Sequence, residues 1–205
     1  MATLINADTS DGLKLTSDTS GEIEFQSAGV TKAGVNATGL TGDGSQLTSL
    51  PAGGKILQVL SVQKTDVFST ASASLVDVTG LTLTITPSSA SSKILFMAFV
   101  GGVGTDNSVV QAVRDTTIIA AGAAAGSRTQ SFAGSFYNGI YGPPAILTAT
   151  INWLDTPATT SAVTYKIKAG AVGGGTLYLG RNATDTDNAQ YARVPQVIIL
   201  MEVAA

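Results

Sequence analysis

The chain has 205 residues, with 11 Lys and Arg, 14 Asp and Glu, and neither His nor Cys, and its formal net charge at pH 7 is −3. The absence of Cys excludes disulfides and thiolate metal sites, and the absence of His removes the commonest general base and metal ligand. We therefore expect a protein that is not an enzyme and needs no cofactor. The scattered basic residues and the short apolar runs also predict no nucleic-acid partner and no membrane insertion.

The composition is unusual for a soluble domain. Charged residues make up 12% of the chain, about half of the usual share of about 25%, and the mean hydropathy is +0.29. A monomer of this size normally keeps a charged surface without large apolar patches. The sequence therefore predicts an obligate homo-oligomer, in which copies of the chain cover one another.

Residues 1–50 form the first region that the pattern distinguishes. They hold six acidic and two basic residues, and their apolar residues occur in short alternating groups within GLKLT, GEIEFQ and AGVTKAGV. Such groups, bounded by Gly, Ser, Asp or Asn, are typical of strands and turns. Because they hold too little apolar area to fold alone, we predict an extended β-rich attachment segment that docks on another protein or on sister chains. A disordered tail is the alternative.

A glycine-rich stretch, GLTGDGSQLTSLPAGGK, spans residues 39–55. A phosphate-binding loop would require G-x-x-x-x-G-K-[ST], but Ile56 follows Gly54-Lys55, and Ser49 stands where the first Gly should be. We interpret the stretch as a hinge that ends at about residue 55.

Residues 56–205 are predicted to form strand after strand, with almost no helix. GLTLTITP (80–87) and AVTYKIKAG (162–170) alternate apolar and polar residues, as a sheet with one buried face requires. AILTATINWLD (145–155) alternates in the same way, and we expect Trp153 to lie in the core. About ten such segments, separated by turn residues, predict an antiparallel sandwich of jelly-roll size.

Two predicted strands are apolar on both faces: KILFMAFVGG (93–102) and PQVIILMEVAA (195–205). In the second of these strands, we expect alternate residues from Val197 to Val203 to be buried on one face. Ile198 and Leu200 make the opposite face apolar as well. A sandwich covers only one face of each sheet, so the other must be covered by neighbouring copies, and a compact trimer would do so. The candidates for the trimer interface or the core are Leu95, Phe96, Phe99, Ile198 and Leu200.

Several stretches resemble a known class of proteins. The opening INADTSDGLKLTSDTSGEIEFQSAGVTKAGV, followed by LTGDGSQLTSL, resembles the N-terminal modules of bacteriophage fibre and other virion structural proteins. LDTPATTSAVTYKI, GGGTLYLGRNATDTDN and the terminal VIILMEVAA resemble the head domains of such fibres, which are expected to be trimeric jelly rolls similar in build to tumour necrosis factor. The resemblance implies a virion protein, assembled in the host cytoplasm, in which residues 1–50 bind another virion protein.

The resemblance leaves the place on the particle open. A short trimeric tail fibre, whose head binds a receptor or glycan on the host surface, is the preferred interpretation. A capsid-decorating trimer is the alternative, and it would suit the short chain. A polysaccharide depolymerase with paired Asp residues is a third hypothesis, but Glu occurs only three times and no convincing pair of carboxylates is present.

Three loops offer side chains that suit sugar hydroxyls or sugar rings. In NATDTDNAQ a calcium loop is also conceivable, but Gln190 and Gln196 stand where that loop requires a Gly and a bidentate acid, which favours a solvated turn. For Phe136 and Tyr141 the alternative is a core position. The candidate contact residues are Asp106, Asn107, Tyr137, Asn138, Tyr141, Asp185, Asp187 and Asn188.

Two arginines have nearby acids in the sequence. We expect Arg114 and Arg181 to pair with Asp115 or Asp185 at the surface, and we assign them no function.

Overall fold

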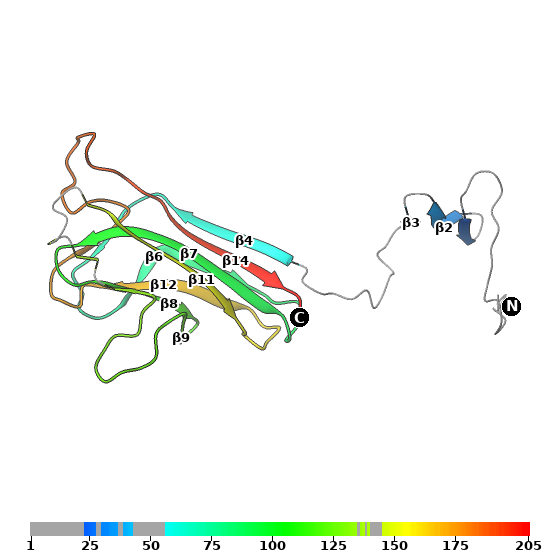
Figure 1. The fold of residues 1–205 in the computed structure, drawn as a ribbon, viewed down its shortest axis with the longest axis horizontal. Helices are drawn as coiled ribbons and strands as arrows, with labels where there is room; N and C mark the ends of the chain where they lie inside the picture. Colours follow the sequence, from blue (N-terminus) through cyan, green and yellow to red (C-terminus); the bar gives the residue numbers. More distant parts are fainter. Residues whose placement is uncertain are drawn as a thin grey trace. The chain divides into compact units, whose positions relative to one another are not determined.

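In a computed structural model of the chain, the structure describes residues 23–27, 30–36, 39–42, 56–134, 136–137, 139 and 145–205. Contacts divide the chain into two units, Met1–Pro51 and Ala52–Ala205, and each is described by itself (Figure 1). Strands dominate the described residues, which confirms the predicted all-β class. The candidate residues Asn138 and Tyr141, and the hinge between residues 43 and 55, lie outside the described residues.

The first unit contains a three-stranded antiparallel sheet in the order β1-β2-β3. Its strands are β1 (Ile23–Ser27), β2 (Val30–Asn36) and β3 (Gly39–Gly42). The first two fall in the GEIEFQ and AGVTKAGV segments, whose alternation predicted strands.

One sheet of the second unit is built around a long central strand, β7 (Lys93–Gly104). Residues Ile94–Phe99 of β7 pair with β14 (Gln196–Val203) on one edge and with β11 (Leu147–Asp155) on the other. Beyond β14, β13 (Leu177–Leu179) continues along the same edge of β7. The outer strands β4 (Ile56–Lys64) and β5 (Phe68–Thr70) pair with β14 and β13 respectively. We call this the first sheet.

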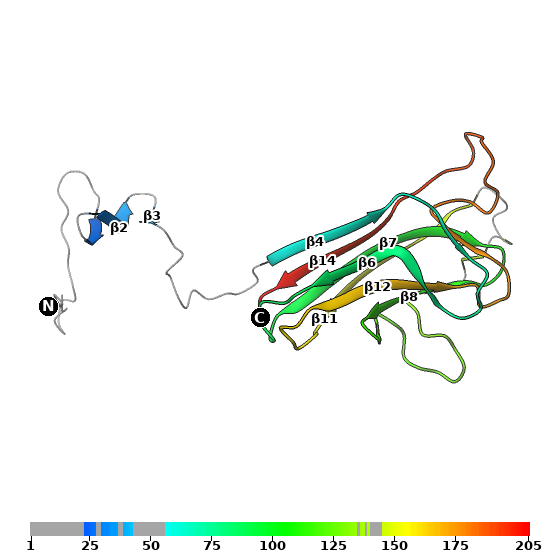
Figure 2. The same cartoon turned by 180° about the vertical axis from the view of Figure 1, so that it is seen from behind.

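The second sheet has the order β10-β8-β12-β6, with β9 also paired to β8. All its pairs are antiparallel. The two sheets lie face to face, as the two opposite views in Figures 1 and 2 show, so the unit is an antiparallel sandwich. Its strands are β6 (Val76–Ile85), β8 (Val109–Arg114), β9 (Thr117–Ile119), β10 (Ala133–Gly134) and β12 (Val163–Gly170).

A single hydrophobic core fills the space between the sheets. The inner residues of β6 and β12 alternate with polar ones as predicted. In β14, however, Ile198 and Leu200 are fully buried in the core, whereas Val197 and Ile199 are only half-buried on the other face. Of the two positions expected for Ile198 and Leu200, interface or core, the structure therefore has the core. Alternation shows that the faces differ, but the pairing with β7 decides which one is inner: Leu200 lies opposite the buried Phe96.

The prediction that Trp153 lies in the core is also wrong, because 43% of its side chain is exposed. Trp153 belongs to β11, which pairs only with β7 among the described strands. A side chain on such an edge strand is covered on one side alone.

The second unit has two distinct ends. β4 begins and β14 finishes at one end, which we call the terminal end. The opposite end, the loop end, carries residues 105–108, 171–176 and 180–195 (Figures 1 and 2). Among the described residues, no helix has the length and apolar character needed to cross a membrane.

Candidate functional site

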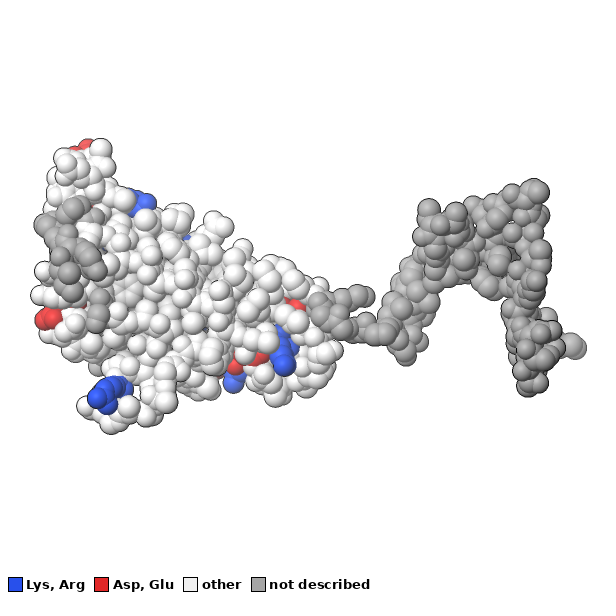
Figure 3. Space-filling view, in the orientation of Figure 1, with Lys and Arg blue, Asp and Glu red and all other residues white. Residues whose placement is uncertain are grey.

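The side of the first sheet that faces away from the core carries no charged side chain from Leu95 to Phe99 of β7 or on the residues that pair with them; Lys93, opposite Val203, lies at its terminal border. We call this set of side chains the outer face. The register places Met201, Ile199 and Val197 of β14 beside β4 on one side and beside β7 on the other. In Figure 3, charged side chains lie toward the margins of the sandwich and the surface between them carries none. The outer face comprises Val59, Ser61, Gln63, Leu95, Met97, Phe99, Thr150, Asn152, Leu154, Val197, Ile199 and Met201.

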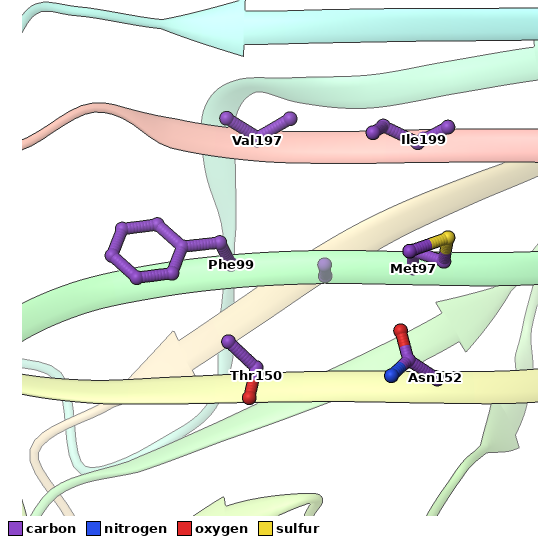
Figure 4. Close-up of a pocket in the computed structure, with 7 residues that line it drawn as sticks. Met97, Phe99, Thr150, Asn152, Val197 and Ile199 are labelled. Atoms are coloured by element: carbon purple, nitrogen blue, oxygen red, sulfur yellow. The ribbon is translucent and has the colours of Figure 1, made fainter.

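A hollow of about 290 Å³ lies in the middle of the outer face. Met97 and Phe99 of β7 bound it along the strand, and the intervening Ala98 turns toward the core, so no side chain fills the gap between them (Figure 4). β14 and β11 close the flanks. The lining residues are Met97, Ala98, Phe99, Thr150, Asn152, Val197 and Ile199. Of the interface candidates from the sequence, Leu95 and Phe99 lie on this face, whereas Phe96, Ile198 and Leu200 are core residues.

Large apolar side chains are exposed at two borders of the outer face. Val59 on β4 is 55% exposed, and Leu154 on β11 is 49% exposed. Trp153 lies beside Leu154 at the edge of the sheet. An apolar surface that joins a hollow and an exposed edge is typical of a protein–protein contact.

The corresponding side of the second sheet has a different chemistry. Lys166 on β12 forms an ion pair with Asp77 on β6, with 2.8 Å between Nζ and Oδ2. The hydroxyls of Thr84 and Thr164 lie 3.0 Å apart on neighbouring strands. Over β6 and β12, this surface is that of a sheet that faces water.

A buried polar cluster links the two sheets. The Asp155 carboxylate on β11 accepts hydrogen bonds from the Tyr165 hydroxyl at 2.7 Å and from Arg114 at 2.6 Å. The Tyr165 ring stacks on Phe96, with 5.9 Å between centroids. Burial and the neighbouring carboxylate raise the pKa of Tyr165 well above its ordinary value. Arg114 therefore pairs with Asp155 and not with Asp115, because the fold brings β8 and β11 together while the Asp115 side chain accepts the Thr164 N–H.

A second buried carboxylate lies near the terminal end. Glu202 is fully buried, and it accepts hydrogen bonds from Ser88 N and Oγ and from Gln58 Nε2, each at 2.7 Å. Burial opposes ionisation, but the hydrogen bonds outweigh it and lower the pKa of Glu202 to about 2. This cluster joins β4, β14 and the segment that follows β6.

The candidates Asp106 and Asn107 lie in a tightly packed loop at the loop end. Asp106 Oδ1 accepts the Asn107 N–H at 2.6 Å, and the Asn107 carbonyl accepts the Gly173 N–H at 2.8 Å. A Cβ at Gly173 would lie 2.6 Å from Asp106 Oδ1, so only glycine fits. Asp106 therefore shapes its own loop, and Asn107 is exposed.

The neighbouring candidate, Tyr137, joins this loop through the backbone. It forms a parallel bridge with Gly104, and its side chain is 37% exposed. Phe136 is 2% exposed, which confirms the alternative that it is a core residue.

The remaining candidates, Asp185, Asp187 and Asn188, line a polar hollow in the loop between β13 and β14. Asp185 pairs with Arg193 at 2.5 Å and lies 3.9 Å from Arg181, so the expected pairing of Arg181 with Asp185 is confirmed. No group of three acidic residues that could hold a metal ion occurs in the part of the chain that the structure describes.

Sequence reasoning missed the structural role of Gln196, which is fully buried. Its amide accepts the Gly101 N–H at 2.8 Å and donates to the carbonyls of Gly101 and Val194 at 3.1 Å. The side chain thus replaces backbone pairing at the point where β13 gives way to β14. A polar residue at the start of a strongly apolar strand is the one signal that pointed to it.

No protein-family model and no curated protein matches the chain.

Proposed function

We propose that the chain is a structural protein of a bacteriophage particle: a short homotrimeric tail fibre whose residues 56–205 form a jelly-roll head that binds the host surface. The observation that carries the trimer is the uncharged outer face with its central hollow. The assignment to a phage particle rests on the sequence resemblance. In this proposal the protein is structural and not catalytic, and it is assembled in the host cytoplasm.

The strand order supports a jelly roll. Along the chain, β4 lies in the first sheet, β6 in the second, β7 in the first and β8 in the second, and the later strands β11, β12 and β14 alternate again. The resulting orders are β4-β14-β7-β11 and β6-β12-β8-β10. Two four-stranded sheets connected by such crossings are what two interlocked Greek keys produce.

The outer face supports a second copy of the chain as its partner. The region around the hollow carries no charge, so a charged partner would find no ion there to pair with, whereas an uncharged surface would bury apolar area without leaving an ion unpaired. The exposed Trp153 and Leu154 at the sheet edge supply such a surface.

The hollow of the outer face and the exposed edge of β11 are two different patches, and this supports a ring of three copies. A contact between two different patches is heterologous, and it closes only if the rotation returns to the first copy. Three copies form the smallest such ring. In it, the edge strand β11 of each copy would pack on the outer face of the next.

The two ends of the sandwich fit the proposed division of labour. The chain enters the head at the terminal end, and the loops with Asp106, Tyr137 and Asp185 lie at the loop end. A head that is attached through its N-terminal side would present these loops to the host. Residues 1–50 would bind another virion protein.

A trimeric capsid-decorating protein is the second candidate. The same outer face would then hold three copies together above the shell.

Labelling of purified virions tests the assignment. Antibody fragments raised against residues 56–205 are expected to mark the tail in electron micrographs. Label spread over the shell would replace the fibre with the decorating protein, and virions without label would refute both. Competition of the purified chain with phage for host cells tests receptor binding, and undiminished infection at saturating protein would contradict it.

A further inference from the structure

The loop that joins β13 to β14 forms a second hollow, separate from the outer face. It has a volume of about 290 Å³ and lies at the loop end. The base of the loop is fixed, because Arg181 and Arg193 form an antiparallel bridge and the Val194 N–H donates to the Gly180 carbonyl at 3.1 Å. The loop that forms the hollow is therefore closed at its base by backbone pairing.

One set of polar groups builds this frame. Arg193 and Asp185 form the close ion pair described above, and Arg181 also stacks over the Tyr178 ring at 4.1 Å. The Asn188 side chain accepts the Gln190 N–H at 2.9 Å, and its carbonyl accepts the Tyr191 N–H at the same distance. These groups are already satisfied within the loop.

A different set lines the hollow without such partners. Among the described residues, the Asp187 carboxylate, the Thr186 hydroxyl and the Tyr191 hydroxyl have no hydrogen-bond or ion-pair partner, although all three line the hollow. Asp187 accepts hydrogen bonds, and the two hydroxyls both donate and accept. Tyr191 is half-buried, so its ring also contributes an apolar wall. This mixture of acceptors, donors and one aromatic ring suits a ligand with vicinal hydroxyls and an apolar face.

The charge of the hollow limits the ligand further. Asp185 and Asp187 are balanced by Arg181 and Arg193, and Arg193 is already occupied by Asp185. An anion would meet the free carboxylate of Asp187. A calcium ion would find only one free carboxylate, whereas it takes six to eight oxygen ligands. A neutral ligand fits best, and a volume near the lower limit of ligand pockets, about 300 Å³, restricts it to one or two sugar units.

We propose that this hollow is a binding site for a neutral saccharide of one or two pyranose units, with Asp187 and Thr186 bonding its hydroxyls and Tyr191 contacting the ring. The proposal deepens the host-surface binding proposed above and rests on it for its biological meaning. The chemical fit of the hollow to a neutral sugar does not depend on the proposed function.

Titration of the full chain with methyl glycosides tests the site. The probes are the methyl glycosides of glucose, galactose, mannose, rhamnose and N-acetylglucosamine, followed by saturation-transfer NMR and calorimetry, with methyl N-acetylneuraminide as the charged comparison. A ligand of this size is expected to bind with a dissociation constant of about 1 mM. Absence of binding by all neutral glycosides at tenfold higher concentration, or preference for the charged sugar, would overturn the proposal.

Two variants locate the binding. Tyr191→Ala and Asp187→Asn are each expected to weaken it at least about tenfold, since the first removes the ring contact with its hydroxyl and the second removes a charged hydrogen-bond acceptor. The controls are Ile118→Ala, which shortens a large exposed side chain on β9, and Asp77→Asn, an exposed carboxylate on the second sheet; both should bind as the unaltered chain does. Equal binding by all four variants would place the sugar elsewhere and refute the site.

These results distinguish a failure of the saccharide site from a failure of the tail-fibre proposal. If the variants lose sugar binding but virion label is absent, the tail-fibre proposal fails and the saccharide site stands. If label marks the tail and the chain blocks infection, while Tyr191→Ala binds glycosides unchanged, the fibre stands and this site is refuted.

Discussion

The outer surfaces of the two sheets belong to the same sandwich, yet they differ in chemistry. The second sheet presents threonines and an ion pair between Lys166 and Asp77, as a sheet in water does. The first sheet presents Met97, Phe99 and Ile199 around a hollow, without a charge. Both sheets bury their inner faces in the same core, so the core does not explain the difference. The proposal that copies of the chain cover the first sheet accounts for it.

The strongest test of this contrast is a lysine placed on each surface. Met97→Lys on the outer face should weaken association at least about 100-fold, because an ammonium group buried in an apolar contact without a partner costs several kcal/mol. Thr82→Lys, at an exposed position of the second sheet, should leave the mass in solution unchanged. Sedimentation velocity over a concentration series measures both. Equal behaviour of the two variants would remove the distinction between the surfaces.

A second test concerns what holds the sheets together. Asp155→Ala would leave the Tyr165 hydroxyl and Arg114 without their shared acceptor in a buried site, and it should lower the free energy of unfolding by about 3 kcal/mol. Asp77→Ala breaks an exposed ion pair and should cost less than about 1 kcal/mol. Urea denaturation at pH 7 compares them. A similar loss in both variants would show that the Asp155 cluster does not link the sheets.

The third test uses pH. The pKa of Glu202 is about 2 in the folded protein, below its ordinary value of 4.5. A carboxyl group whose folded pKa is depressed stabilises the fold fully above the unfolded value, and this contribution is lost as the pH falls from about 4.5 toward 2. The loss should be on the order of 2 kcal/mol. Glu202→Gln should flatten this part of the stability curve, and an unchanged curve would exclude the hydrogen-bonded carboxylate as its cause.

The smallest expected effect is spectroscopic. Trp153 is the single tryptophan of the chain, and it lies at the edge that the proposed ring would cover. Its fluorescence should shift to longer wavelength in Met97→Lys relative to the unaltered chain, because a dissociated edge exposes the indole to water. Identical spectra, with a proven change in mass, would place the contact away from β11.

Alternation of residue types was enough to predict the strands and the all-β class, because a sheet with one buried face repeats every two residues. It failed where both faces are apolar. In β14 the sequence shows two apolar rows, and only the pairing of Leu200 with Phe96 decides which row faces the core. Trp153 was misplaced for a related reason: its neighbours in the sequence are those of a core strand, but β11 lies at an edge.

Contacts between distant segments explain the other misses. Arg114 and Asp155 are 41 residues apart and meet only because the two sheets pack together, whereas the sequence offered the adjacent Asp115. Gln196 fills a gap in pairing next to Gly101 that exists only once β13 and β14 share an edge of β7. The loop of Asp185 and Asp187 was identified from residue types alone, but the closure of its base by Arg181 and Arg193 was not.

The central claim is that three copies of the chain cover one another's outer faces. Sedimentation equilibrium of the purified full chain, from dilute to concentrated solution, tests it most directly. The account predicts a species of three times the chain mass of 20.6 kDa that is reduced to single chains by Met97→Lys. A folded, stable species of 20.6 kDa at every concentration would contradict it.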